Sequence, residues 1–142
     1  MKYSSIPYLF LSLIVIACSV SKVPKQAETE VEKALKETHY YRLFTDATKN
    51  ALIPISRKVA ISMFNACIVD YPERAAPYYQ LSSIFLSEQQ LGLAREYARK
   101  AVIRDSSNYW YKVHLANIYQ MAGEHKKFLT IYEPVHLLDH KN

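Results

Sequence analysis

The sequence predicts an all-α solenoid of about three helix-turn-helix hairpins, preceded by an extra helical segment. Its 142 residues include only 2 Gly and 6 Pro, fewer than the turns of a many-stranded protein require. Half of the residues are hydrophobic and 22% are charged, so the chain can bury a core. Residues 41–74, 75–108 and 109–142 align without a gap at a period of about 34 residues, which is typical of stacked helical hairpins.

The aligned positions share size and polarity. Leu81 aligns with Leu115, and the small residues Ser82 and Ala116 follow them. Further aligned sets are Ala60, Ala94 and Phe128; Phe64, Ala98 and Tyr132; and Cys67, Ala101 and Val135. Small residues at recurring places indicate helices that cross closely. Turns are expected at residues 53–56, 87–92 and 121–124, between one helix and the next.

This pattern resembles the tetratricopeptide repeat (TPR). The signature is an aromatic residue, a Leu followed by a small residue, a second aromatic, then an Ala with an aromatic four residues later and a Pro at the exit. The matching residues are Tyr78, Leu81, Ser82, Phe85 and Ala94 in the middle repeat, Ala60, Phe64 and Pro72 in the first, and Leu115, Ala116, Tyr119 and Tyr132 in the third. Residues that depart from it include Ala98, Ser106, Lys112, Phe128 and His140. The resemblance implies a right-handed superhelix that binds proteins without catalysis.

The resemblance also implies a peptide-binding groove along the first helix of each hairpin. The candidate groove residues are Arg42, Lys49, Tyr79, Gln80, Ser83, Trp110, His114 and Asn117. Tyr79 and Trp110 are the expected anchors, and the amides of Gln80 and Asn117 would pair with peptide backbone. The alternative is that the two aromatics only cover the interface between hairpins. The Lys and Asn clamp with which some family members hold a C-terminal carboxylate is not reproduced, because Thr45 and Lys49 occupy the matching positions.

The first residues predict export. Residues 1–17 read as a signal peptide, because their apolar run of about ten residues is too short to cross a membrane. The four residues from Val15 to Cys18 resemble the lipobox of bacterial lipoproteins, which implies acylation (palmitate) at Cys18. Residues 18–26 would then be a tether and residues 27–142 the repeat domain. The alternative is an ordinary secretory signal with a coincidental Cys.

Together these resemblances imply a lipid-anchored protein of a Gram-negative cell envelope that binds a protein or peptide partner. Ser19 after Cys18 favours the outer membrane, with the domain facing the periplasm. The alternative is an assembly subunit that docks end to end or in a larger outer-membrane complex through its solenoid ends. Residues that would leave the last hairpin with an apolar edge are Phe128, Ile131, Val135 and Leu138. An uncovered last repeat is also expected of a shortened form of a longer repeat protein.

Other functions are disfavoured, and no cofactor or metal is expected. Gly92 and Gly123 are too few for a phosphate-binding loop, and His136 with His140 lacks further ligands for a metal. Cys67 lies in an apolar run and is expected to be buried. Nucleic-acid binding is disfavoured by export, despite a net charge of +5. The basic stretch 93–105 is instead expected to bury its alanines and to turn its charged residues largely to solvent: Arg95, Glu96, Arg99, Lys100 and Arg104.

Overall fold

The computed structural model describes the backbone of residues 25–139 and the side chains of residues 29–133. The predicted signal peptide, Cys18, most of the tether and His140 lie outside this part of the chain. The described part consists of six α-helices and one short 3-10 turn: α1 (Lys25–Ala51), η1 (Pro54–Ser56), α2 (Arg57–Asp70), α3 (Ala75–Ser87), α4 (Leu91–Arg104), α5 (Tyr109–Met121) and α6 (His125–Asp139).

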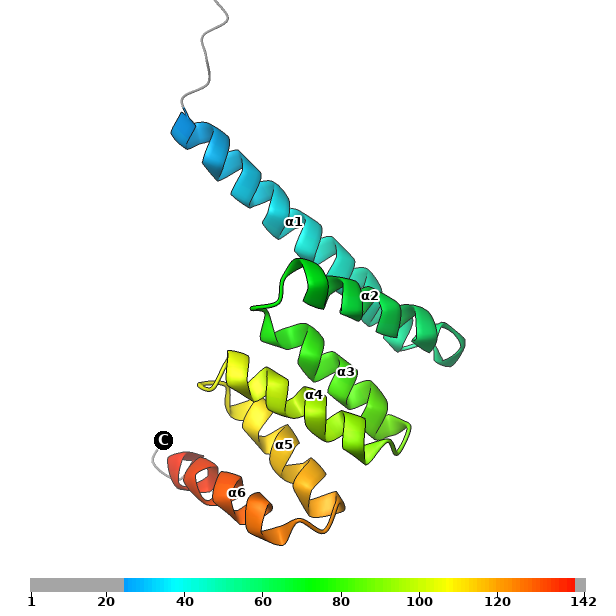
Figure 1. The fold of residues 1–142 in the computed structure, drawn as a ribbon, viewed down its shortest axis with the longest axis vertical. Helices are drawn as coiled ribbons and strands as arrows, with labels where there is room; N and C mark the ends of the chain where they lie inside the picture. The colour runs from blue at the N-terminus through cyan, green and yellow to red at the C-terminus, as the bar shows by residue number, and fades with distance from the viewer. Residues whose placement is uncertain (1–24, 140–142) are drawn as a thin grey trace, which may run out of the picture.

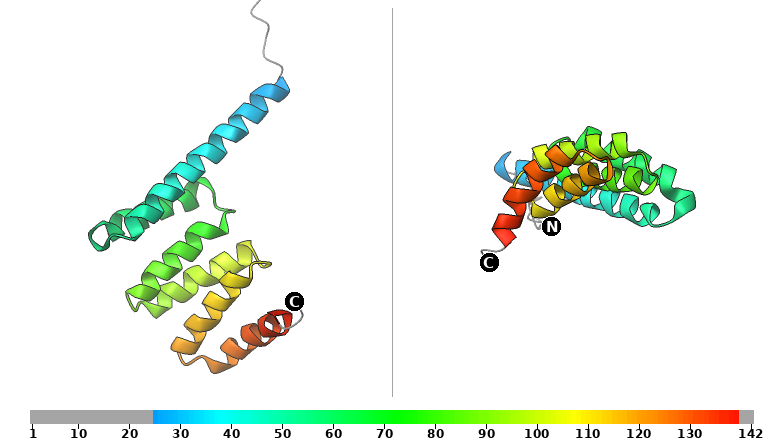
Figure 2. Two further views of the ribbon diagram at one scale, coloured as in Figure 1. Left: turned by 180° about the vertical axis from the view of Figure 1, so that it is seen from behind. Right: turned by 90° about the horizontal axis from the view of Figure 1, so that it is seen from below.

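The helices pair into three hairpins, α1–α2, α3–α4 and α5–α6, which stack in chain order (Figure 1). Figure 2 shows the odd-numbered helices along one side of the stack and the even-numbered helices along the other. The turns fall where the sequence predicts them, between α1 and α2, between α3 and α4, and between α5 and α6. The predicted all-α hairpin solenoid is therefore confirmed.

The core follows the repeat alignment. Ala60 and Phe64 of α2 are fully buried with Leu81 of α3, and Ala94 of α4 is fully buried against Leu115 of α5. The ring of Phe85 packs against both groups of buried residues, so the core is continuous from one hairpin to the next. This continuity is what stabilises a hairpin that could not bury its apolar face alone.

The small residues expected at helix crossings are all buried. Ser82 and Ala116 have almost no exposed surface, and neither do Ala60 and Ala94. Cys67 is also buried, as predicted, and burial raises the pKa of its thiol to about 11. A thiol in such surroundings stays protonated at neutral pH, so it acts as a small apolar core residue.

Charged side chains tie each turn to the preceding hairpin. Arg57 of α2 lies 3.9 Å from Glu88 in the α3–α4 turn, and Arg95 of α4 pairs with Glu124 in the α5–α6 turn. Each pair is partly exposed, so we expect it to contribute at most about 1 kcal/mol. Each of the two pairs joins one hairpin to the next.

The prediction that the charges of α4 face solvent needs one correction. Glu96 and Lys100 do form an exposed ion pair at 2.6 Å. Arg104, however, stacks its guanidinium carbon 3.8 Å from the centroid of the Tyr78 ring, and its Nε donates to the Pro72 carbonyl at 2.5 Å. Arg95 is engaged with Glu124, as described above. The error arose because helical periodicity assigns the faces of one helix but does not predict contacts from the partner helix or from the neighbouring repeats.

Helix α1 is longer than a repeat helix. It begins at Lys25, two residues before the helical pattern was expected to start, and it runs without a break into the first hairpin. Its first half extends past α2 (Figure 1), and Val31 and Leu35 there are 58% and 65% exposed. The Tyr71 hydroxyl, from the α2–α3 connection, donates to the Lys36 carbonyl at 2.9 Å and marks where the packed half begins. None of the described helices is long and apolar enough to cross a membrane.

Candidate peptide-binding groove

The candidate groove lies along α1, α3 and α5, which contact one another directly. Helix α1 touches α3, and Tyr79 of α3 packs against two residues of α5. The ring centroids of Tyr79 and Tyr111 are 5.1 Å apart, and those of Tyr79 and His114 are 4.9 Å apart. These first helices lie along the inner side of the arc seen end-on in Figure 2.

The candidate residues on α1 give one end of the groove a basic character. Arg42 and Lys49 are both exposed. Lys49 lies 3.5 Å from Asp46, one turn earlier on the same helix. This pair is largely solvated, so Lys49 can exchange Asp46 for a carboxylate on a partner at little cost.

The candidate residues on α3 and α5 differ in how far they are exposed. Trp110 is 69% exposed and meets the Tyr109 ring edge-on at 5.2 Å, and Asn117 is also exposed. Tyr79 is only half-buried, whereas the Ser83 hydroxyl is used within its own helix, donating to the Tyr79 carbonyl at 3.1 Å. Gln80, partly exposed on the same helix as Tyr79, completes the set. The structure thus places aromatic, amide and hydroxyl groups on neighbouring helices of one layer.

His114 belongs to the wall of the groove. The hydroxyl of the buried Ser82 donates to the Ala94 carbonyl at 2.7 Å and lies 2.8 Å from His114 Nε2. Since the hydroxyl hydrogen is already used, His114 Nε2 must carry a hydrogen and donate to Ser82. Burial lowers the pKa of the His114 imidazole, so the ring is neutral at pH 7. This chain of hydrogen bonds joins α3, α4 and α5.

The neutral His114 predicts a stability that falls in mild acid. Unfolding returns the imidazole to its ordinary pKa of 6.5, so the unfolded chain takes up the proton at a higher pH than the folded chain. The free energy of unfolding should be highest above pH 6.5 and should decrease as the pH falls through that value. Urea titrations at neutral and mildly acidic pH should show this loss for the wild type and a smaller loss for His114→Gln, whose amide can still donate.

His125→Gln, at an exposed position of α6, is the matched control for that comparison. It should retain the full pH dependence of the wild type. An equal loss of stability in the His114→Gln variant would show that other groups cause the pH dependence.

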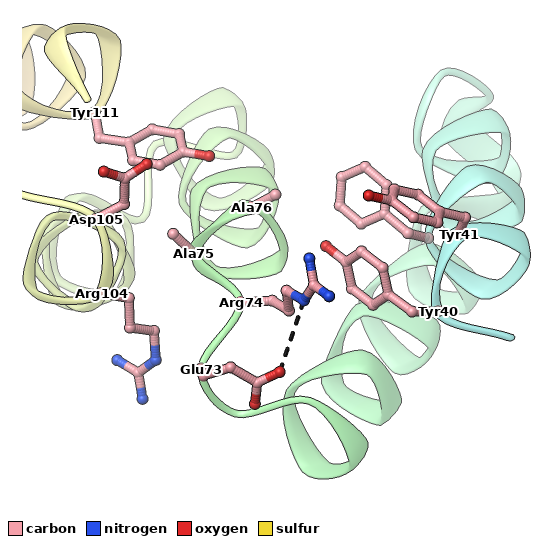
Figure 3. Close-up of a pocket in the computed structure, with 10 residues that line it drawn as sticks. Tyr40, Tyr41, Glu73, Arg74, Ala75, Ala76, Arg104, Asp105 and Tyr111 are labelled. Atoms are coloured by element: carbon pink, nitrogen blue, oxygen red, sulfur yellow. Dashed lines mark ion pairs between the residues drawn. The ribbon is translucent and has the colours of Figure 1, made fainter. Parts of the chain in front are cut away.

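A pocket of about 480 Å³ opens beside the groove, where α3 begins (Figure 3). Residues from α1 and α5 form its walls and the start of α3 forms its floor; they include Tyr40, Tyr41, Phe44, Arg74, Ala75, Ala76 and Tyr111. The pocket exists because the middle repeat has two alanines at its first positions. The equivalent positions carry Tyr41 and Arg42 in the first repeat and Tyr109 and Trp110 in the third. The repeat pattern does not predict this contrast, because the pattern consists of residues that the repeats share.

Charged residues surround the pocket. Arg74 pairs with Glu37 of α1, and its Nε lies 3.6 Å from Glu73. Its guanidinium carbon is 4.9 Å from the centroid of the Tyr40 ring. Across the floor, Asp105 accepts a hydrogen bond from the Ser107 hydroxyl at 2.7 Å, which lowers the pKa of its carboxyl group and keeps it ionised.

The described residues offer binding groups and no metal centre. Within residues 29–133, no three His, Cys, Asp or Glu side chains lie close enough together to hold a metal ion. Rings, amides and hydroxyls along a curved layer suit the recognition of a peptide, since rings supply contact area and amides supply directional hydrogen bonds. The stacked hairpins and their inner layer of first helices define a right-handed superhelical solenoid of the tetratricopeptide type.

Among the solved structures that share this fold, two match over most of the chain. Both are of MamA: one is the MamA RS-1 ArsTM double mutant, with a TM-score of 0.65, and the other is MamA 41-end from Desulfovibrio magneticus RS-1, with a TM-score of 0.64. Each is 24% identical in sequence and covers 82% of this chain. The chain spans 66% and 67% of their respective lengths. No protein-family profile and no curated protein sequence matches the chain. The similarity therefore shows the fold.

Proposed function

We propose that this chain is a non-catalytic interaction module that binds a peptide segment of a partner protein in its inner groove. The observation that carries the proposal is the 69% exposure of Trp110 on α5, the helix against which the half-buried Tyr79 of α3 packs. A large exposed ring on the inner layer of a solenoid is typical of an anchor that becomes buried on binding. Repeat solenoids of this type present extended concave surfaces to their partners, which also supports the proposal.

The proposal predicts that Tyr79→Ala combined with Trp110→Ala strongly reduces partner recovery. Both rings lie in the inner layer, so their loss should reduce partner crosslinking in intact cells at least about tenfold, as expected for two anchor residues. The matched control replaces Arg99 and Ile103, exposed residues of α4 in the outer layer, by Ala. The control should retain the partner. Equal recovery with both double variants would rule out the groove.

We further propose that the module is held at a membrane by a lipid on Cys18, at the outer membrane and facing the periplasm. The support is the lipobox-like sequence from Val15 to Cys18, which lies outside the described residues. Several acyl chains would hold a protein at a membrane far more firmly than one.

Cys18→Ala should move the protein from the membrane fraction to the soluble fraction. Cys67→Ala is the matched control, because Cys67 is buried in the core and should not affect the anchor. A Cys18→Ala protein that stays in the membrane fraction after an alkaline wash would contradict the lipid anchor. Separation of inner from outer membranes then tests the location of the wild type.

A second candidate function is structural assembly through the two ends of the solenoid. The observation in its favour is that apolar side chains are exposed at both ends: Val31 and Leu35 on α1, and Leu129 and Tyr132 on α6. Val31→Lys combined with Leu35→Lys tests this candidate by sedimentation and by partner crosslinking. If this variant loses the partner and the groove variant keeps it, assembly is the better description.

A further inference from the structure

We propose that the turn between α1 and α2 inserts its apolar side chains into the surface of an anionic membrane. Four aliphatic side chains are exposed there and form an apolar tip: Leu52 at 80%, Ile53 at 50%, Ile55 at 91% and Val59 at 52%. Ile55 is the most exposed large apolar side chain that the structure describes. The apolar tip contains none of the candidate groove residues and does not involve Cys18, so the inference goes beyond the proposed function.

Apolar residues are unexpected at this turn, because turns usually consist of polar residues. The middle repeat follows that rule, since the residues aligned with Ile53, Pro54 and Ile55 are Ser87, Glu88 and Gln89. The α1–α2 turn lies at an outer corner of the molecule, away from the other hairpins (Figures 1 and 2). Adjacent apolar side chains exposed in this way mark an interaction surface.

The backbone of the turn is already paired, as entry into an apolar layer requires. The amides of Leu52, Ile53 and Ser56 donate to carbonyl groups within residues 49–53, at 3.3, 3.2 and 3.0 Å respectively. Pro54 has no N–H group. These hydrogen bonds reduce the cost of moving the turn out of water.

Positive charge lies directly behind the apolar tip. No Asp or Glu occurs from residue 47 to residue 69, and the cations in that stretch are Lys49, Arg57 and Lys58. Lys49 and Arg57 each pair with one acidic residue outside the stretch, whereas Lys58 is exposed on the first turn of α2. Two further exposed cations, Lys126 and Lys127, follow the α5–α6 turn on the same edge of the solenoid (Figure 1). Aliphatic side chains with cations behind them match a membrane that has an apolar interior and negative headgroups.

The shape and composition of the apolar tip favour a membrane over a protein partner. The core of a protein interface is typically rich in aromatic side chains, whereas the tip presents aliphatic ones. A projecting turn needs a matching cavity in a protein, but a fluid lipid layer closes around it. The partner of this surface is therefore a bilayer with anionic headgroups, which the tip binds reversibly.

A fluorescent label at the tip tests the proposal on the full chain. Cys18→Ala combined with Ile55→Cys provides one accessible thiol for an environment-sensitive nitrobenzoxadiazole label, because Cys67 is buried. Every variant retains the apolar run of residues 1–17, which can itself bind vesicles, so the label has to report on the tip alone. Its emission should move to shorter wavelength with vesicles of equal parts phosphatidylglycerol and phosphatidylcholine. Vesicles of phosphatidylcholine alone should cause little change.

A label at Val69→Cys is the matched control for position. Val69 is 77% exposed at the other end of α2, and its label should not respond to either kind of vesicle. The charge is tested with Lys58→Glu, which should raise the lipid concentration for the half-maximal shift at position 55 about tenfold. Arg99→Glu, which changes the net charge equally at an exposed position of α4, should have a much smaller effect.

Three results would overturn the proposal. The label at position 55 could fail to respond to anionic vesicles, or could respond no more than with phosphatidylcholine alone or than the label at position 69. Lys58→Glu could have no larger effect than Arg99→Glu. A shift that appears without vesicles as the protein concentration rises would instead assign the apolar tip to contacts between copies of the chain. Since neither the groove nor a lipid on Cys18 takes part, the result is independent of the crosslinking and fractionation tests.

Discussion

Replacing Phe64 by Ala should lower the free energy of unfolding by about 4 kcal/mol. Phe64 is fully buried in α2 and meets the ring of Phe44 in α1 edge-on, with 5.6 Å between the ring centroids. It also packs in the group that contains Leu81 of α3, so its side chain joins the first hairpin to the second. Its removal leaves a cavity at a junction held by other rigid side chains, which therefore cannot collapse fully.

Urea unfolding followed by far-UV circular dichroism measures this change. Val69→Ala, on the same helix but 77% exposed, is the control and should change the free energy of unfolding by no more than about 0.5 kcal/mol. Phe64→Leu should lie between the two. A loss below about 1 kcal/mol for Phe64→Ala would mean that the first hairpin is not packed as described.

The second large effect is expected for Ser82→Ala, which should lower the free energy of unfolding by about 2 kcal/mol. The change leaves the Ala94 carbonyl and the His114 Nε2–H group without their shared partner in a buried interface. The volume change is small, so the loss measures unsatisfied polar groups more than a cavity.

The neighbouring serine provides the control for that prediction. Among the described residues, the Ser83 hydroxyl bonds to the Tyr79 carbonyl of its own helix and to no other group. Ser83→Ala should therefore change the free energy of unfolding by less than about 0.5 kcal/mol. Equal effects at Ser82 and Ser83 would contradict a linking role for Ser82. The double variant Ser82→Ala with His114→Gln should lose less than the sum of the two single changes, since the two residues share a bond.

Most of the fold could be predicted from the sequence because core residues of the same kind recur at the same positions in successive repeats. The pairs Ala60 with Phe64 and Leu115 with Ala116 each appear at a fixed place in the 34-residue alignment, and each is buried. Periodicity could not predict contacts between repeats that involve unlike residues. Arg104 with the Pro72 carbonyl and Arg95 with Glu124 are of that kind, because they depend on the angle between hairpins.

The candidate groove could be predicted in part from the repeat register, whereas the pocket could not. The positions of Tyr79 and Trp110 follow from the repeat register, but the hydrogen bond that holds His114 in the wall depends on the exact approach of α3 to α5. The pocket could be found only from what differs among repeats. Tyr40, Arg74 and Asn108 occupy equivalent positions in the three repeats. Tyr40 lies in the middle of α1, whereas Arg74 and Asn108 are the N-cap residues of α3 and α5. The side chain of Asn108 caps its helix, and the side chain of Arg74 does not.

The uninterrupted α1 has a mechanical consequence. Its 27 residues form a rod of about 40 Å, of which only the second half is clamped by the first hairpin. A helix bends far less than an extended chain over this length. Helix α1 therefore sets both the distance and the direction from residue 25 to the inner groove. Pulling on a partner held in the groove would thus transmit torque along α1, and inserting a proline near Lys33 would turn that rod into a hinge.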